Sequence, residues 1–276
     1  MSSDDDLRFV RELARAVAAE IAPLAGRVRR ETKTHAAAQA ETVTECDRAA
    51  QRRIVAALRA RFPADGVIGE EDEHGEGITR IAGGGRVWVI DPIDGTNNFV
   101  AGFGCFAVCI ARLDDGVPAL GVVHDATRGI SYAAARGCGA WADERPLRCR
   151  AEPYEPNDLL MLTCNLVRSD GSLPPWFLRW CQEARKLRML GSAALEAMAV
   201  AAGQAQAAIT LHGKLWDLAA PAAIVEAAGG IVSGLDGAPL FPIELRSYQG
   251  ARIPFVAAAP RVHAALLAEL ASARGR

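Results

Sequence analysis

The chain has 276 residues, of which 50% are apolar and 23% are charged, a composition typical of a folded globular protein rather than a disordered one. The formal net charge is −2 and the charges are mixed along the chain without a long basic tract, so a nucleic-acid partner is not expected. The seven cysteines form no Cys-x-x-Cys pair and the N-terminus is acidic, which predicts a cytoplasmic protein with reduced thiols and no signal peptide.

The first half of the chain predicts two helices followed by an antiparallel meander that they cover. Apolar residues recur at helical spacing over residues 4–30, and a second helix is expected from Thr44 to Phe62. Short segments, separated by turns and rich in β-branched or aromatic residues, then predict strands at 86–91, 104–113, 117–124 and 129–135.

After about residue 150, expected strands alternate with expected helices, which predicts a layered α/β half. Segment 193–211 has Glu196 as its only charge, yet it is rich in alanine and interrupted by Gly203. A buried helix and a strand are therefore expected there rather than a membrane span. The strands are expected at 158–164, 187–190, 206–211, 230–233 and 253–258, and the helices at 174–184, 192–203, 217–228 and 260–273.

The stretch from Trp88 to Asn97 holds the densest set of potential metal ligands. An apolar strand leads to Asp91, the following proline fixes the backbone at a sharp turn, and Asp94 comes next but one after it. Both carboxylates can therefore converge on one point, with the carbonyl of Ile93 between them. Oxygen ligands at this density favour Mg²⁺ or Ca²⁺ over zinc or copper. The structural alternative is an ordinary Asp-Pro turn with Asp94 as a helix cap.

Gly95 and Thr96 follow at once and can open a helix. The first N–H groups of a helix have no intrahelical partner and are well placed to bind phosphate. A metal site and a phosphate site are therefore expected within a few residues of each other.

Two further acidic positions lie at the ends of expected elements. Glu70 and Glu71 end a short apolar strand, and since adjacent carboxylates repel each other, burying them near other acids requires a cation. Asp217 lies just ahead of a helix that ends at Gly230. Each position also has a structural alternative: a solvated turn for the two glutamates, and a helix N-cap for Asp217.

In this order, these motifs resemble the signature of the inositol monophosphatase family, and the resemblance extends over nearly the whole chain. The two longest motifs are highly specific, so that a chance occurrence of the set in order is remote. The residues that carry the resemblance are Thr42-x-Thr44-x-x-Asp47, Gly69-Glu70-Glu71, Asp91-Pro-Ile-Asp-Gly-Thr96-x-Asn-Phe99, Gly191-Ser-Ala193 and Trp216-Asp217.

The resemblance implies an α/β fold of alternating layers of helices and sheets, an αβαβα sandwich. Residues 1–150 are expected to form a half with a mostly antiparallel sheet and most of the metal ligands. Residues 151–276 are expected to form a mixed α/β half with Asp217 and the substrate-side residues. The two halves are expected to pack as one catalytic unit, and the resemblance also suggests a homodimer.

The resemblance further implies a Mg²⁺-dependent phosphomonoesterase with two or three ions per site, which Mn²⁺ can also serve and lithium inhibits. In-line attack on phosphorus by a metal-activated water is expected, without a Ser, Cys or His nucleophile. Glu71 is expected to contribute only through water or a weak further metal. The family's metal ligands correspond here to Glu70, Asp91, the carbonyl of Ile93, Asp94 and Asp217.

Catalytic roles are implied for Glu70, Thr96 and Asp47. Thr96 resembles the residue that orients the attacking water, and Asp47 resembles the partner of that hydroxyl, although Thr44 and Asp47 can also form a capping box. The residues implied on the substrate side are Asp94, Gly95, Thr96, Gly191, Ser192, Ala193, Thr210 and Asp217.

The sequence departs from the inositol-selective members at Thr210, where those members have an acidic residue. Threonine can form a hydrogen bond but cannot offer a bidentate carboxylate, and His212 and Lys214 make this string basic. Inositol monophosphate is the first candidate substrate. Histidinol phosphate, 3'-phosphoadenosine 5'-phosphate and fructose bisphosphate are the alternatives within the family, and a non-catalytic regulatory binding protein is the alternative of another class. A second departure, Gly104 in place of a proline, concerns the shape of a loop.

Overall fold

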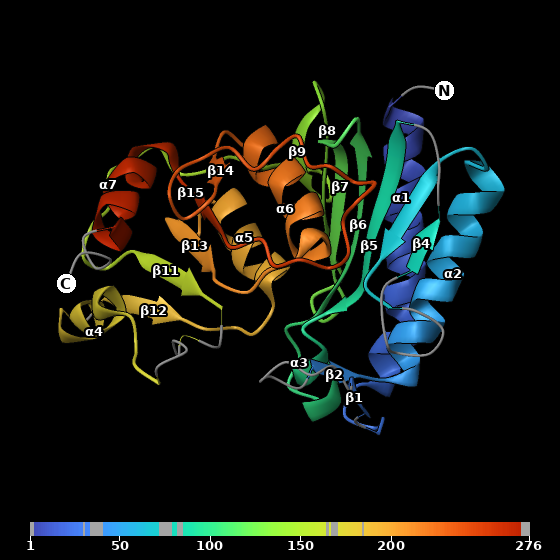
Figure 1. Ribbon diagram of the computed structural model, residues 1–276, viewed down its shortest axis with the longest axis horizontal. Helices are drawn as coiled ribbons and strands as arrows, with labels where there is room; N and C mark the ends of the chain where they lie inside the picture. Colours follow the sequence, from blue (N-terminus) through green and yellow to red (C-terminus); the bar gives the residue numbers. More distant parts are fainter. Residues whose placement is uncertain are drawn as a thin grey trace.

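The computed structural model describes residues 3–29, 31–33, 41–71, 79–81, 85–163, 166, 171–183 and 185–271. Its elements form five layers in the order helices, sheet, helices, sheet, helices (Figure 1). The αβαβα architecture is therefore confirmed. Each sheet is covered on both faces, which is why its central strands are buried along nearly their whole length rather than at alternate residues.

The first layer consists of α1 (Ser3–Ile21) and α2 (Glu45–Arg61), which pack their apolar sides on the larger sheet. The helix predicted over residues 4–30 is wrong at its end, because α1 stops at Ile21 and a 3₁₀ turn, Ala22–Leu24, follows. Pro23 explains the stop, since proline lacks the N–H for the helical hydrogen bond and its ring disfavours helical backbone in the preceding residue.

The larger sheet has eight strands in the order β10-β9-β8-β7-β6-β5-β3-β4. Neighbouring strands are antiparallel, which confirms the meander, except that β3 runs parallel to β5. This parallel pair places the C-terminal ends of β3 and β5, where the two acidic motifs lie, side by side at the same end of the sheet. The strands are β3 (Gly66–Gly69), β4 (Thr79–Ile81), β5 (Arg86–Asp94), β6 (Ala107–Asp114), β7 (Val117–Asp125), β8 (Ile130–Ala135), β9 (Gly139–Ala142) and β10 (Arg145–Pro146).

The middle layer consists of α5 (Ala193–Ala201) and α6 (Leu215–Ala227), which lie between the two sheets (Figure 1). All nine residues of α5 are buried, because this helix is covered on every side and has no polar face. Segment 193–211 is thus a buried helix followed by a strand, as predicted. Among the described residues, no helix is long and apolar enough to cross a membrane.

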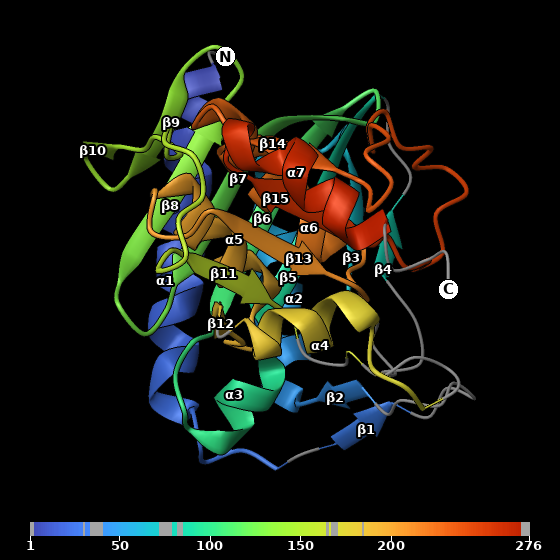
Figure 2. The same cartoon turned by 90° about the vertical axis from the view of Figure 1, so that its left-hand side faces the viewer.

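The smaller sheet has five strands in the order β12-β11-β13-β15-β14. Its strands are β11 (Leu159–Leu162), β12 (Lys186–Arg188), β13 (Ala207–Thr210), β14 (Ile231–Ser233) and β15 (Phe255–Ala258). β11 is parallel to β12 and β13, whereas β15 is antiparallel to its neighbours, so the sheet is mixed as expected. The outer layer, α4 (Pro175–Gln182) and α7 (Pro260–Ala271), lies in front of this sheet in Figure 2.

A two-stranded hairpin, β1 (Glu31–Lys33) and β2 (Glu41–Val43), lies beside the short helix α3 (Thr96–Ala101) at one end of the molecule (Figure 2). The side chain of Thr42 and the residues Cys164, His35 and His74 lie outside the part of the chain whose side chains are described. The other six cysteines are free thiols. The division of the chain near residue 150 stays a prediction.

Candidate metal centre

The parallel pairing of β3 and β5 aligns the ends of the two acidic motifs. Gly69 is paired with Ile90, and the N–H of Glu70 donates to the carbonyl oxygen of Ile90 at 3.1 Å. Glu70 therefore follows β3 directly beside the place where Asp91 leaves the regular ladder of β5. The register between β5 and β6 shifts from Asp91 to Asp94, which accommodates Pro92, a residue without an N–H donor, inside the strand.

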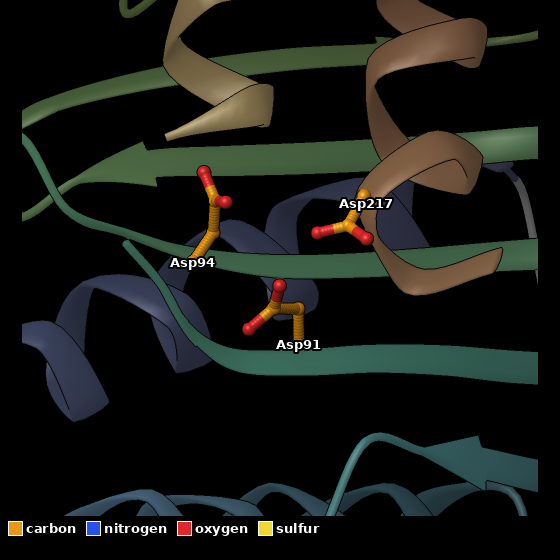
Figure 3. Close-up of side chains that lie close together, drawn as sticks. All are labelled: Asp91, Asp94 and Asp217. Carbon is orange, nitrogen blue, oxygen red and sulfur yellow. The ribbon is translucent and has the colours of Figure 1, made fainter. Parts of the chain in front are cut away.

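Asp217, from the first turn of α6, joins the two aspartates of β5. Each of the three carboxylates offers an oxygen, and these oxygens lie within 4.8 Å of one another (Figure 3). Asp217 also accepts from the backbone N–H of Lys214 at 2.7 Å. Asp217 thus accepts a hydrogen bond at the start of α6 and also belongs to the acidic cluster, so its structural contact does not exclude a metal-binding role.

Burial and mutual repulsion make this cluster unfavourable in its charged form. Burial, followed by the charges of Glu70 and the other two aspartates, raises the pKa of Asp91 well above its usual range. Burial, followed by the charges of Asp94 and Glu70, also raises the pKa of Asp217. Hard oxygen ligands that repel one another in a buried place fit a divalent cation such as Mg²⁺, which would compensate their charge.

Asp94 differs from the other two because donors from the middle layer surround it. Its Oδ1 accepts from the N–H of Ala193 at 3.2 Å, and its Oδ2 accepts from the N–H of Ala194 at 3.0 Å and from the hydroxyl of Ser192. Burial raises the pKa of Asp94 to about 6, while these hydrogen bonds act in the opposite direction. The start of α5 therefore contacts the metal centre directly.

The other expected ligands lie around this group. Glu70 lies beside Asp91, whose pKa it raises by its charge and a hydrogen bond. Glu71 is buried, and its backbone N–H donates to Oε1 of Gln51 at 3.0 Å. The carbonyl oxygen of Ile93 lies 3.0 Å from the hydroxyl oxygen of Thr96 and is one of two acceptors within reach of its single proton. Glu70 and Glu71 stay outside the group of three mutually close carboxylates, among the residues that the structure describes.

Thr96 and Asp47 are brought together as the sequence predicted. The hydroxyl of Thr96 donates to Oδ1 of Asp47 at 3.2 Å, and Oδ2 of Asp47 accepts from the backbone N–H of Thr44 at 2.8 Å. The capping box and the contact to Thr96 thus coexist on one fully buried side chain. Burial raises the pKa of Asp47 to about 6, although its hydrogen bonds oppose the shift.

The turn after β5 approaches the substrate-side segment closely at Gly95. This residue has a φ of +93°, and a Cβ on it would lie 2.8 Å from the carbonyl oxygen of Cys105 and 3.3 Å from that of Gly191. Both the backbone conformation and the space therefore require glycine here. The helix expected after Gly95 is present as α3.

Known proteins share this chain's sequence pattern and fold. The family model described as "Inositol monophosphatase family" matches residues 4–275. The chain belongs to the inositol monophosphatase family. Members of this family are phosphatases, so the chain is a phosphoric monoester hydrolase.

Individual relatives agree with this family assignment. A protein of Thermotoga maritima named fructose-1,6-bisphosphatase/inositol-1-monophosphatase is 37% identical over 71% of this chain and 73% of its own length. A Pseudomonas aeruginosa protein named Nus factor SuhB is 37% identical over 72% and 74%. The solved structure of a Thermotoga maritima IMPase superposes with a TM-score of 0.84 at 29% identity and 98% coverage of both chains.

One of the residues that the sequence predicts on the substrate side is a buried threonine. Thr210 ends β13 with 2% of its surface exposed, and its hydroxyl has no hydrogen-bond partner among the described residues. Its methyl group faces Gly213, since a Cβ there would lie 2.8 Å from it. Its role in substrate binding stays a prediction.

Basic side chains lie along the loop next to Asp217. Nη1 of Arg252 donates to Nδ1 of His212 at 3.1 Å, and Nζ of Lys214 lies 5.2 Å from the centre of the Trp216 ring. The charge of Lys214 also lowers the pKa of Asp217, against the larger opposing effects. Lys214 and Arg252, which we call the basic rim, therefore place positive charge beside the loop that leads to the acidic cluster.

Three residues of the site received no role from the sequence. Nδ2 of Asn98 donates to the carbonyl oxygens of Cys105 at 2.9 Å and of Leu190 at 2.7 Å. The hydroxyl of Tyr248 accepts from the N–H of Leu215 at 2.8 Å, at the start of α6. Glu196 contacts the segment before α5. The signals were present for two of them, because Asn98 lies within the family motif and Glu196 is the only charge in a long apolar stretch.

Proposed function

We propose that the protein hydrolyses a small phosphate monoester in a Mg²⁺-dependent reaction, with inositol monophosphate as the first candidate substrate. The observation that carries this proposal is the convergence of three largely buried aspartates from two layers, with the Thr96–Asp47 pair next to them. Buried carboxylates that repel one another require a compensating cation, and a hydroxyl–carboxylate pair beside that cation can orient a water for attack on phosphorus.

The residues present fit the metal that the family uses. Two or three Mg²⁺ ions, or Mn²⁺ in their place, would be held by Glu70, Asp91, the carbonyl of Ile93, Asp94 and Asp217, with Glu71 acting through water. When bound, the cations supply the positive charge that activates a water and stabilises the developing charge on phosphate oxygens.

The chain's own residues position the reactants. The hydroxyl of Thr96 has one proton, which would go to Asp47 once the carbonyl of Ile93 holds a cation, so its oxygen could accept a hydrogen bond from the attacking water. Glu70 would accept from the same water on the side of Asp91. The backbone N–H groups of Gly95 and Thr96 would donate to the phosphate. This arrangement leaves orientation to the protein and needs no covalent intermediate.

The alcohol side of the substrate would lie against Gly191, Ser192 and Ala193, with Asp94, Asp217 and Thr210 around it. This side offers no acidic residue in place of Thr210, and the rim carries Lys214 and Arg252. A phosphate monoester with a second anionic group is therefore the second candidate, which the Thermotoga relative's name also supports. Histidinol phosphate is a third candidate within the family.

A regulatory binding role is the alternative of another class, and the relative named Nus factor SuhB supports it. The complete set of carboxylates favours catalysis, whether or not a regulatory role accompanies it. We also propose that the protein acts as a cytoplasmic homodimer and that lithium inhibits it. A direct contact with nucleic acid is not proposed, because the chain has a net charge of −2.

The experiment that tests this function is phosphate release from a panel of phosphorylated metabolites, with Mg²⁺ and with excess chelator. The expected result is Mg²⁺-dependent release that chelator abolishes, with the highest kcat/KM for inositol monophosphate. Release that is undiminished in excess chelator contradicts the proposed mechanism. No release from any member of the panel, with metal bound, would favour the regulatory role.

A further inference from the structure

Glu196 has the only ionisable side chain on α5, and the residue is 0% exposed. Its Oε1 accepts from the backbone N–H of Leu190 at 2.8 Å and of Gly191 at 3.2 Å. Its Oε2 has no hydrogen-bond partner among the described residues. Burying a carboxyl group costs free energy, because the group loses its hydrogen bonds to water. Its hydrogen bonds within the protein must offset that cost.

The two N–H groups belong to the segment that leads into the metal centre. The next residue, Ser192, caps α5 by accepting from the N–H of Leu195 at 3.2 Å. Its hydroxyl donates to Asp94, as do the first two amides of the helix. The position of residues 190 and 191 therefore determines whether the donors at the start of α5 can reach Asp94.

The same segment is fixed from its other side by the turn after β5. Nδ2 of Asn98 donates to the carbonyl oxygen of Leu190 at 2.7 Å. The carbonyl oxygen of Gly191 lies 3.3 Å from the place that a Cβ on Gly95 would take. Residues 190 and 191 thus lie between Glu196 and the turn that carries the proposed phosphate donors.

We propose that Glu196 is a positioning residue, which holds the N–H groups of Leu190 and Gly191 and thereby sets the substrate-side segment 190–194 and the orientation of Asp94. The inference rests on the proposed function for its effect on catalysis. Burial raises the pKa of Glu196 to about 8, so the neutral acid predominates at pH 7. Glutamine has nearly the same shape and keeps an oxygen that accepts both N–H groups.

The test compares Glu196→Gln, Glu196→Met and a matched control, Gln206→Ala. Methionine fills the space without accepting a hydrogen bond. Gln206 is also 0% exposed, lies beyond the far end of α5 and donates through Nε2 to Asp158 at 3.0 Å. The readouts are amide hydrogen exchange of metal-free protein, and kcat, KM and the Mg²⁺ concentration for half-maximal activity.

Glu196→Met is expected to speed exchange at Leu190 and Gly191 and to lower kcat/KM by about ten- to hundredfold, with a higher Mg²⁺ requirement. Glu196→Gln is expected to restore the wild-type values within about threefold. Gln206→Ala is expected to lower the melting temperature and leave exchange at both amides and kcat/KM unchanged.

The inference is overturned if Glu196→Met exchanges these amides at the wild-type rate, or if Glu196→Gln is as impaired as Glu196→Met. An equal loss of kcat/KM in Gln206→Ala would assign a merely structural role and overturn it too. Should Glu196→Met fail to fold, Glu196→Gln alone decides. The exchange readout needs neither metal nor substrate, so its result stands even if the phosphatase proposal fails.

Discussion

The hydroxyl of Thr96 donates to the carboxylate of Asp47 at 3.2 Å, although the two residues are 49 positions apart. The same hydroxyl lies 3.0 Å from the carbonyl oxygen of Ile93, a proposed metal ligand. The other oxygen of Asp47 accepts from Thr44 at the start of α2. One buried carboxylate thus serves both a helix cap and the proposed catalytic hydroxyl, and substitutions can separate the two.

Thr96→Val removes the hydroxyl and keeps the β-branched shape. Turnover is expected to fall by about 100-fold or more, because the attacking water loses its orienting acceptor. Asp47→Asn is expected to lower both turnover and the melting temperature, since an amide cannot accept from Thr44 and Thr96 as a carboxylate does. Steady-state kinetics and thermal melts of metal-free protein measure the two effects.

The double variant shows whether the two residues act as one unit. If Thr96 acts through Asp47, the double variant is expected to lose little more turnover than the worse single variant. Thr44→Ala is the control for the cap alone, with an expected cost of about 0.5–2 kcal/mol of stability. Fully additive losses of turnover would contradict the proposed pair.

Asp91→Asn and Asp217→Asn remove charge from the metal centre while retaining size. Turnover is expected to fall at least ~100-fold in each variant, the scale of losing several kcal/mol of transition-state stabilisation. The melting temperature of the metal-free protein is expected to stay or rise, because repulsion within the cluster is relieved. An asparagine oxygen can still accept from the N–H groups of Ile93 and Lys214.

The matched control for this pair is Asp125→Asn. Asp125 is 2% exposed and accepts from the N–H groups of Thr127 and Arg128 at 3.0 and 2.9 Å. It lies two strands from Asp94 in the sheet and outside the group of three close carboxylates. Its substitution is expected to leave turnover unchanged. If Asp91→Asn or Asp217→Asn unfolds the metal-free protein, these aspartates are structural caps instead.

Much of the fold could be predicted from the sequence because most elements have strong local patterns. The strands of the meander and the helix Glu45–Arg61 lie within a few residues of their expected positions. The strand β3 was predicted, but not its parallel pairing with β5, and the short strands β4, β9 and β10 were not predicted. The position of a strand in a sheet is decided by contacts with segments far away in the sequence. The residues of a short segment do not reveal those contacts.

The candidate site, too, could be predicted only in part from the sequence. Asp91, Ile93 and Asp94 share one turn, so their proximity follows from the chain itself. The donors that surround Asp94 come from the start of α5, about a hundred residues later. That contact depends on how the middle layer packs between the sheets, which explains why Glu196 was noticed as a lone charge but received no role.

The metal centre should also show itself in the pH dependence of stability. A carboxyl whose pKa is raised in the folded state stabilises the fold at low pH, and this contribution is lost as pH rises through the folded pKa. For Asp94 that value is about 6, and the pKa values of Asp91 and Asp217 are raised in the same direction. Metal-free wild-type protein should therefore lose stability relative to Asp217→Asn as pH rises from about 4 to above 6.

Added Mg²⁺ should reverse this trend, because the cation binds the deprotonated carboxylates. The rise in melting temperature caused by Mg²⁺ is expected to grow over the same pH range and to be largely absent in Asp217→Asn. Thermal melts with Mg²⁺ and with chelator measure both trends. A metal-free wild type that gains stability over this range relative to Asp217→Asn would contradict the assigned repulsion.

Substrate choice should depend on the basic rim more than on Thr210, of whose surface only 2% is exposed. Lys214→Met removes the charge and keeps an aliphatic chain above the Trp216 ring. If Lys214 contacts a second anionic group, KM for fructose bisphosphate should rise about ten- to hundredfold, the value of one charge-assisted hydrogen bond. KM for inositol monophosphate should change far less, because its alcohol side is neutral.

The measurement requires saturating Mg²⁺, since the charge of Lys214 also lowers the pKa of Asp217 and its loss can weaken metal binding. Lys186→Met, at an exposed position on β12, controls for the loss of one positive charge from the chain. Arg252→Gln should shift KM in the same direction as Lys214→Met, because Arg252 contacts His212 on the same rim. An equal rise of KM for both substrates in Lys214→Met would mean that the lysine does not discriminate between them. In that case the preference must arise elsewhere on the proposed alcohol side, for example at Ser192, whose hydroxyl donates to Asp94.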